Sequence, residues 1–152
     1  MARGTAHIGA DKYTTRIEVG GHALVGDEPV RNGGQDAGPA PYDYLLAGLG
    51  ACTAITLRMY ADRKQWPVDA IDVDLHLTHG EDGAMLIRRT LVIGGAVDDE
   101  QKARLAEIAE KTPVTLTLKA GLRIDTALAE VDQYIVMNWI PALAGMTMHA
   151  PT

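Results

Sequence analysis

Apolar and polar positions change their period several times along this chain of 152 residues. Between residues 71 and 79, the segment IDVDLHLTH alternates apolar and polar side chains strictly, which is typical of a strand with one buried face. The sequence GEDG at 80–83 favours a turn, and MLIRRTLVI at 85–93 favours a returning strand. Residues 71–93 are therefore predicted to form a β-hairpin.

A second β-hairpin is predicted near the N-terminus. The segments at 13–19 and 22–25 flank Gly20-Gly21, a pair that is typical of a tight turn. The residues that follow, 27–40, contain Pro, Gly, Asn and Asp at a density that indicates a loop. The chain is therefore expected to open with a small β-element and then a long connection.

The loop leads into a long apolar helix. It is predicted to begin at Pro41, because proline is favoured at the first helical position, and to end near Lys64. Glycines and alanines shorten its side-chain layer, so that another helix could approach closely. The apolar face is wider than one thin sheet can cover, and we therefore expect a homodimer that buries it. The predicted apolar face consists of Leu45, Leu49, Cys52, Thr56 and Met59, with Leu46, Thr53, Leu57 and Tyr60 beside them.

Two shorter helices are predicted further along the chain. Asp98 and Gln101 form a capping-box pattern in front of a helix at about 99–111. The Thr-Pro pair that comes next is typical of an N-cap followed by the first helical residue, and it favours a short helix at 113–119. The sequence VTLTL in the same place alternates like a strand, so capping and periodicity disagree there.

The predicted order ends with a strand at 122–129 and a tail. Residues 136–152 show neither a period nor a cap, and we expect a single domain at 1–130 and a C-terminal tail at 131–152 outside its core. Strands and helices do not alternate in a βαβ rhythm, and no internal repeat is found. The predicted fold class is α+β, with the long helix packed against antiparallel sheets.

The charge balance argues against nucleic acid and membrane partners. The chain carries 20 acidic and 14 basic residues, a formal net charge of −6, and no dense cluster of Lys and Arg. Its apolar run at 45–57 is well short of the roughly 20 residues that cross a bilayer. A single cysteine cannot form an internal disulfide, and the first residues lack the apolar stretch of a signal peptide. We therefore expect a cytoplasmic protein.

Sequence motifs for metals and cofactors are missing. The chain contains no CxxC, HExxH, P-loop or G-x-S-x-G pattern, and its glycine pairs lack the strand-to-helix context of a dinucleotide site. The five histidines share no metal-ligand spacing apart from a weak pair at His76 and His79. No metal and no cofactor is therefore predicted.

The candidate chemistry rests on Cys52. A single cysteine on an apolar helix face is most often a small core hydrophobe. However, the surrounding sequence PYDYLLAGLGACTAITLRMYADRKQWP, preceded by GDEPVRNGGQDAGPA, resembles the OsmC/Ohr family in its OsmC-like branch. The resemblance covers residues of about 13 to 130, and it includes the segment DDEQKARLAEIAEKTPV.

The resemblance implies both a fold and an activity. Members of this family look like intertwined homodimers in which sheets wrap two central helices and the active sites lie at the subunit interface. The better-studied members are thiol peroxidases that reduce organic hydroperoxides, and Cys52 occupies the place of their attacking cysteine. Arg31 stands at the spacing of the arginine that holds the thiolate and the peroxide. The alternative interpretation of Arg31 is a solvent-exposed charge in a loop.

Two positions depart from the family pattern. Thr112 stands where the family usually has a second cysteine, so a sulfenic acid at Cys52 would need an external thiol reductant. The family's glutamate after the proline is also missing, because Tyr42 follows Pro41. Asp43, one position on, either replaces that glutamate or only favours the helix N-terminus by its charge. Thr112, Asp43 and Tyr42 are accordingly predicted as pocket residues.

Three functions remain open at this stage. The preferred one is a redox protein that reduces small organic hydroperoxides through Cys52, with Arg31 as its electrostatic partner. The alternative is a non-enzymatic member that keeps the fold and binds a small apolar ligand. In the third, the small-residue helix mainly drives assembly, and the thiol has no chemical role.

Overall fold

The computed structural model describes residues 1–131, and the predicted tail beyond them lies outside the described residues. The chain divides into a compact unit, Met1–Gly121, and a second unit that starts at Leu122. The first unit contains two antiparallel sheets and three α-helices, so the predicted α+β class is confirmed. The domain boundary near residue 130 stays a prediction.

A three-stranded antiparallel sheet opens the chain. It consists of β1 (Gly4–Ile8), β2 (Thr15–Val19) and β3 (His22–Gly26), in that order. Gly20 and Gly21 connect the last two strands with φ angles of 58° and 80°, the conformation that a tight hairpin turn requires. The predicted hairpin is thus confirmed. Strand β1 was missed, because GTAHI is short and only one of its alternating positions holds a large apolar side chain, Ile8.

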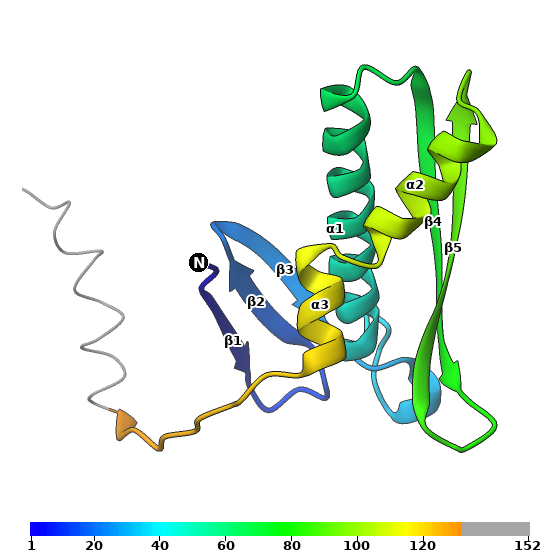
Figure 1. The fold of residues 1–152 in the computed structure, drawn as a ribbon. Coiled ribbons are helices and arrows are strands. Elements are labelled where there is room, and N and C mark those ends of the chain that lie inside the picture. Colours follow the sequence, from blue (N-terminus) through cyan, green and yellow to red (C-terminus); the bar gives the residue numbers. More distant parts are fainter. Residues whose placement is uncertain (132–152) are drawn as a thin grey trace, which may run out of the picture. The chain divides into compact units, whose positions relative to one another are not determined.

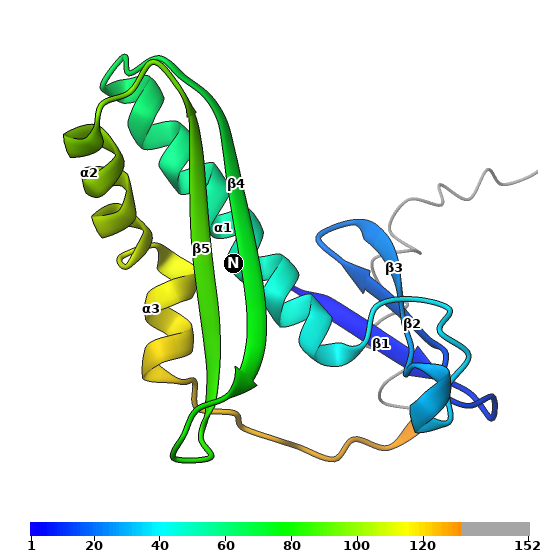
Figure 2. The ribbon, with the colours of Figure 1, turned by 90° about the vertical axis from the view of Figure 1, so that its right-hand side faces the viewer.

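The second sheet is the hairpin of β4 (Val68–His79) and β5 (Met85–Gly95), as predicted from the alternating pattern. Its register pairs Val73 with Leu91 and Leu77 with Ile87. Both strands therefore present an apolar row on one face. Figures 1 and 2 show the three helices gathered on one side of this long hairpin, as the helix contacts of Arg89 from β5 also require.

The long helix α1 (Pro41–Arg63) begins at the predicted proline. Its buried residues follow a spacing of four: Leu49, Thr53, Leu57 and Ala61. Within one chain this stripe coincides only in part with the predicted apolar face, since Leu45 and Met59 are 46% and 61% exposed. A helix that is apolar over a wide arc does not reveal by itself which stripe faces the sheet. Here the β4–β5 hairpin and the two shorter helices select the stripe of α1 that is buried.

Helices α2 (Asp99–Ala109) and α3 (Pro113–Ala120) confirm the remaining helix predictions. The Asp98 carboxylate accepts the Gln101 N–H, and the Gln101 side chain in turn accepts the Asp98 N–H, at 2.8 and 3.0 Å. The main core lies where α1 meets α2 and the open end of the β4–β5 hairpin, at which β4 begins and β5 ends. It consists of Leu57, Ala61, Val68, Val97, Leu105 and Ala109.

The strand predicted at 122–129 is wrong. Residues 122–130 form neither helix nor strand, and Ile124 and Leu128 are 85% and 99% exposed. An apolar alternating segment becomes a strand only when a sheet edge supplies hydrogen-bond partners and a surface to cover. Within the described residues, no strand pairs with this segment.

Helix α1 is long and apolar enough to cross a membrane if only its length and composition are considered. The core helix of a soluble protein passes the same test, so this is weak evidence. The buried stripe from Leu49 to Ala61 and its contacts with β4, α2 and α3 identify α1 as a packing helix.

Candidate functional site

The only cysteine meets the start of a second helix. Cys52 lies on α1 and is partly buried. The backbone N–H of Val114, in the first turn of α3, points at its sulfur with an N···S distance of 3.5 Å. Sulfur is a weak acceptor as a thiol, and the same contact becomes a charge-assisted hydrogen bond once the sulfur is ionised.

Two residues before Val114, Thr112 contributes to a buried polar network. Thr112 precedes α3 as its N-cap and is fully buried. Its hydroxyl lies 2.6 Å from the hydroxyl of Thr115. Because Thr115 Oγ1 donates its own hydrogen to the Ala109 carbonyl, Thr112 is the donor in this pair. Position 112 thus belongs to a polar network and offers no sulfur to Cys52.

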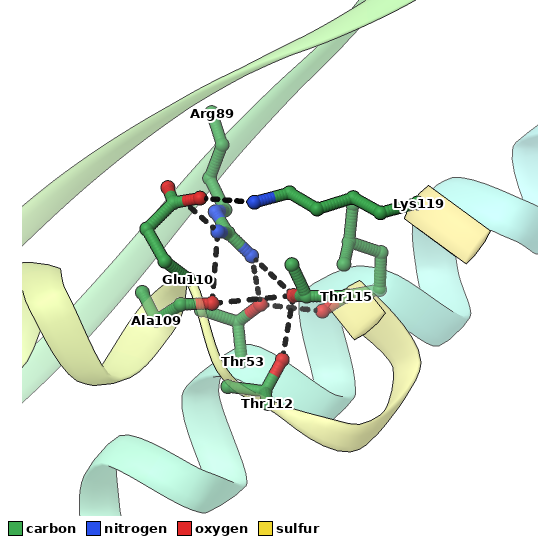
Figure 3. A network of polar contacts seen from close by, with 8 residues as sticks. Thr53, Arg89, Ala109, Glu110, Thr112, Thr115 and Lys119 are labelled. Carbon is green, nitrogen blue, oxygen red and sulfur yellow. Dashed lines mark hydrogen bonds and ion pairs between the residues drawn. The ribbon is translucent and has the colours of Figure 1, made fainter. Parts of the chain in front are cut away.

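Arg89 is the centre of that network (Figure 3). Its Nη1 donates to Thr53 Oγ1 at 3.0 Å and to Thr115 Oγ1 at 2.9 Å. Its Nη2 donates to the Ala109 carbonyl at 2.9 Å and to Glu110 Oε1 at 3.3 Å. The four hydrogens of the two Nη atoms therefore all have acceptors. These acceptors lie on α1, on α3 and at the C-terminal end of α2.

Two charged side chains close the network on the solvent side. Lys119 Nζ lies 2.6 Å from Glu110 Oε2, and both side chains are 58% exposed. The hydrogen bond from Lys119 lowers the pKa of Glu110 below its ordinary value, with a further contribution from the Arg89 charge, although partial desolvation acts in the opposite direction. Glu110 is therefore ionised at neutral pH and balances the Arg89 charge.

A mostly apolar cavity of about 470 Å³ adjoins the network. Leucines from α1 and β4–β5, including Leu46, Leu49 and Leu86, form much of its wall. Arg89 and Thr115 line it as well, so its polar end is the network itself. Cys52 is not among the lining residues.

The other predicted site residues lie at the N-terminal end of α1. Arg31 is exposed in a short 3-10 helix, η1 (Val30–Asn32), and it lines a second cavity of about 710 Å³ together with Tyr42 and Asp43. Cys52 is nine residues beyond Asp43, or about 14 Å along the helix axis at 1.5 Å per residue. Among the described residues, no hydrogen bond or ion pair joins Arg31 to Cys52 within one chain. The structure therefore brings Arg31, Tyr42 and Asp43 together, and Cys52 instead meets Val114, two residues beyond Thr112.

Asp43 and Tyr42 each have a local contact. The Asp43 carboxylate accepts the backbone N–H of Ala40 at 2.9 Å, which stabilises the first turn of α1. This contact corresponds to the expected role in which Asp43 only favours the N-terminus of the helix. Tyr42 is 54% exposed, and its hydroxyl lies 3.9 Å from the sulfur of Met85. Tyr42 also lines both cavities.

The loop that carries Arg31 is organised by a buried carboxylate, Asp27. Its oxygens accept backbone N–H groups from Tyr13, Glu28, Gln35 and Ala37, and the hydroxyl of Thr14. Desolvation opposes ionisation of Asp27, but the four backbone hydrogen bonds together outweigh it and lower its pKa. The charged carboxylate therefore fixes the path of the loop between β3 and α1.

Sequence reasoning missed Arg89 and Asp27. Arg89 keeps the period of Ile87, Leu91 and Ile93, so it falls on the apolar face of β5. An arginine at such a position must find acceptors in the protein, and this could have indicated a buried network. Asp27 had no such signal, because its partners are backbone groups that only the folded loop brings near. Among the described residues, no cluster of His, Cys, Asp or Glu could hold a metal ion.

The fold and the amino-acid sequence together define the class of protein. Residues 33–127 match the family described as OsmC-like protein, and this chain belongs to that family. Members of the family are soluble proteins. No curated protein matches the chain.

Several solved structures share the fold. An OsmC-like protein from Mycoplasma pneumoniae superposes with a TM-score of 0.66 at 18% identity, covering 86% of this chain and 98% of that one. An organic hydroperoxide resistance protein OsmC from Legionella pneumophila gives 0.57 at 20% identity, with 78% and 89% covered. The organic hydroperoxide resistance protein OhrB of Bacillus subtilis gives 0.55 at 25% identity, with 80% and 92% covered.

Proposed function

We propose that this protein reduces small organic hydroperoxides through Cys52 as a single reactive cysteine. The observation that carries the proposal is the Val114 N–H aimed at the sulfur of Cys52 on the central helix of an OsmC-like fold. The similarity to organic hydroperoxide resistance proteins, among them OhrB of Bacillus subtilis at 25% identity, supports the same reaction class. A partly buried thiolate that accepts a helix N–H is a suitable nucleophile for an O–O bond.

The reaction would proceed in two stages. The Cys52 thiolate attacks the terminal oxygen of the hydroperoxide, the O–O bond breaks, and the alkoxide takes up a proton to leave as an alcohol. Cys52 is then a sulfenic acid. One external thiol condenses with it to a mixed disulfide and releases water, and a second external thiol restores Cys52 and leaves as a disulfide. Because Thr112 carries no sulfur, both reducing equivalents come from outside the chain.

The proposed electrostatic partner, Arg31, requires a second subunit. Within one chain it lines a cavity with Tyr42 and Asp43 at the N-terminal end of α1, and Cys52 is about 14 Å further along the helix axis than Asp43. We propose that a homodimer brings Arg31 of one subunit near Cys52 of the other. The exposed stripe of Leu45, Ile55 and Met59, from 46% to 61% exposed, runs along the same side of α1 as Cys52 and supports such a dimer.

The test is a trapping experiment on the pre-reduced full chain. Cumene hydroperoxide is added, and the sulfenic acid of Cys52 is trapped with a dimedone reagent and measured by intact mass. Cys52→Ser, Arg31→Ala and Arg63→Ala are compared with the wild type; Arg63 is an exposed arginine at the end of α1 and serves as the matched control. We expect fast trapping that slows at least about tenfold in Arg31→Ala and is unchanged in Arg63→Ala.

Mixing the variants tests the subunit arrangement. A dimer of one Cys52→Ser chain and one Arg31→Ala chain contains one complete site only if the two residues come from different subunits. Activity regained on mixing would support the arrangement across the interface, and no regain would contradict it. If Cys52 reacts with the hydroperoxide no faster than a small free thiol at the same pH, the peroxidase proposal is wrong.

The second candidate function is binding of a small apolar ligand without chemistry. The 470 Å³ cavity with its leucine wall and charged end favours it, because it has the size and lining of a small-molecule site. An alkyl carboxylate that binds equally well to the wild type and to Cys52→Ser, in a protein that forms no sulfenic acid, would support this function. The proposed localisation for either function is the cytoplasm.

A further inference from the structure

An arginine on the apolar face of a strand is the least expected residue of this fold. Arg89 pairs with Leu75 across the β4–β5 hairpin and follows the same period as Leu91 and Ile93. Its side chain is 11% exposed. Burying a guanidinium carries a large desolvation penalty unless its N–H donors find acceptors. Those of Arg89 find acceptors on three helices. The proposed reaction leaves this residue without a role.

We propose that Arg89 is a positioning residue for Cys52: its guanidinium fixes the start of α3 against α1, so that the Val114 N–H stays on the cysteine sulfur. This inference rests on the proposed function for its biological meaning. The geometry behind it does not depend on peroxide chemistry. Figure 3 shows the guanidinium between Thr53 of α1 and Thr115 of α3.

The positions of the two threonines explain the effect. Thr53 follows Cys52 directly in α1, and Thr115 follows Val114 directly in α3. One nitrogen of Arg89, Nη1, donates to both hydroxyls, at 3.0 and 2.9 Å. Thr53 and Thr115, the neighbours of Cys52 and Val114, are thus held by the same nitrogen atom. Because Nη1 links the two hydroxyls, a shift of α3 along α1 by more than about 1 Å would stretch at least one of the two hydrogen bonds beyond its normal length.

The other half of the guanidinium holds the connection between α2 and α3. Nη2 donates to the Ala109 carbonyl at the C-terminal end of α2, where a cation also interacts favourably with the helix dipole. It reaches Glu110 as well, and Glu110 binds Lys119 of α3. The short segment that contains Thr112 is therefore fixed at both ends by one side chain.

A lysine cannot replace this arrangement. Its ammonium is a point donor, whereas the four acceptors of Arg89 need the planar fork of two nitrogens. Arg89→Lys keeps the positive charge and removes the fork. The substitution therefore distinguishes the positioning effect of Arg89 from the effect of its charge. Arg88→Lys is the matched control, because Arg88 is the adjacent residue on β5 and is exposed on the opposite face.

The experiment measures alkylation of Cys52 in the full chain by iodoacetamide at about pH 7 and about pH 9.5, since only the thiolate reacts. In Arg89→Lys we expect the rate at the lower pH to fall about threefold, and the rate at the higher pH to stay within a factor of about 1.5, because the lost N–H contact favours only the ionised sulfur. Arg88→Lys should match the wild type at both pH values.

A second pair of variants covers the case in which Arg89→Lys does not fold. Thr115→Val removes the hydroxyl that Arg89 and Thr112 share, and Thr115→Ser keeps it. We expect Thr115→Val to reproduce the loss at the lower pH and Thr115→Ser to restore the wild-type ratio of rates. Circular dichroism and the melting temperature identify any variant that has lost its fold.

Each outcome decides the proposal. A lowered rate confined to the lower pH, in Arg89→Lys or Thr115→Val, supports it. If the ratio of the alkylation rate at the lower pH to that at the higher pH is the same in those variants as in Arg88→Lys, the proposal is overturned. An equal rise of the rate at both pH values also overturns it, because such a rise indicates only that the site has become more accessible. If the wild type does not react with cumene hydroperoxide but the alkylation pattern holds, the proposed function fails and the positioning role of Arg89 stands.

Discussion

Replacing Thr53 by valine tests the buried network through stability alone. Thr53 is fully buried in α1; its hydroxyl accepts from Arg89 at 3.0 Å and donates to the Leu49 carbonyl at 2.7 Å. Valine has nearly the same shape and removes only the hydroxyl. The substitution therefore leaves one N–H of the Arg89 guanidinium without an acceptor in a buried place.

The magnitude follows from the two hydrogen bonds. Loss of the bond from the charged guanidinium costs about 1.5–3 kcal/mol. Loss of the bond to Leu49 costs little, because that carbonyl also accepts the backbone N–H four residues on in the helix. The methyl group that replaces the hydroxyl returns about 0.8 kcal/mol of transfer free energy. We expect the free energy of unfolding to fall by about 1–2 kcal/mol as the net of these terms.

The assay is urea unfolding followed by circular dichroism, at one protein concentration for all variants, because oligomerisation would make the midpoint depend on concentration. The control is Thr56→Val. Thr56 lies one turn further along α1, is partly buried, and has no side-chain hydrogen bond among the described residues. It should change the free energy of unfolding by less than about 0.5 kcal/mol. If Thr53→Val and Thr56→Val have the same effect, the Arg89–Thr53 hydrogen bond contributes nothing and the reasoning is refuted.

Two further predictions concern the dimer and the loop. Gly48→Leu should dissociate the proposed homodimer in sedimentation experiments and leave the subunit folded, since an added Cβ meets no atom within 4 Å there, whereas Gly50→Leu should lower stability because its Cβ would lie 3.0 Å from Leu75. A dimer that survives Gly48→Leu would exclude this face of α1 as the interface. Asp27→Asn should destabilise the protein at neutral pH, because an amide presents donors to backbone N–H groups. The folded pKa of Asp27 lies below its ordinary 3.8, so this carboxylate stabilises the fold fully above that pH and loses its effect as the pH falls through the folded value. The difference in the free energy of unfolding between wild type and Asp27→Asn should therefore become smaller in acid. A difference that does not depend on pH would contradict this prediction.

The local chemistry of the sequence determined most of the elements. Proline at position 41, the reciprocal pair Asp98 and Gln101, and the glycine pair at 20–21 each act within a few residues, and each marked a boundary that the structure has. The strict alternation from Ile71 to Thr78 determined the long hairpin in the same way. The family resemblance around Cys52 also needed no coordinates, because it rests on side-chain identities in register.

The tertiary structure alone decided which groups meet. The sequence could not choose the buried stripe of α1, because several arcs of that helix are apolar and only the covering elements select Leu49, Thr53, Leu57 and Ala61. Residues 122–129 alternate like a strand but find no edge to pair with in the described chain. The Arg89 network joins side chains 26 and 36 residues apart, and the Val114 N–H reaches Cys52 across 62 residues. Such contacts depend on the packing of helices against a sheet, and no local pattern of residues encodes that packing.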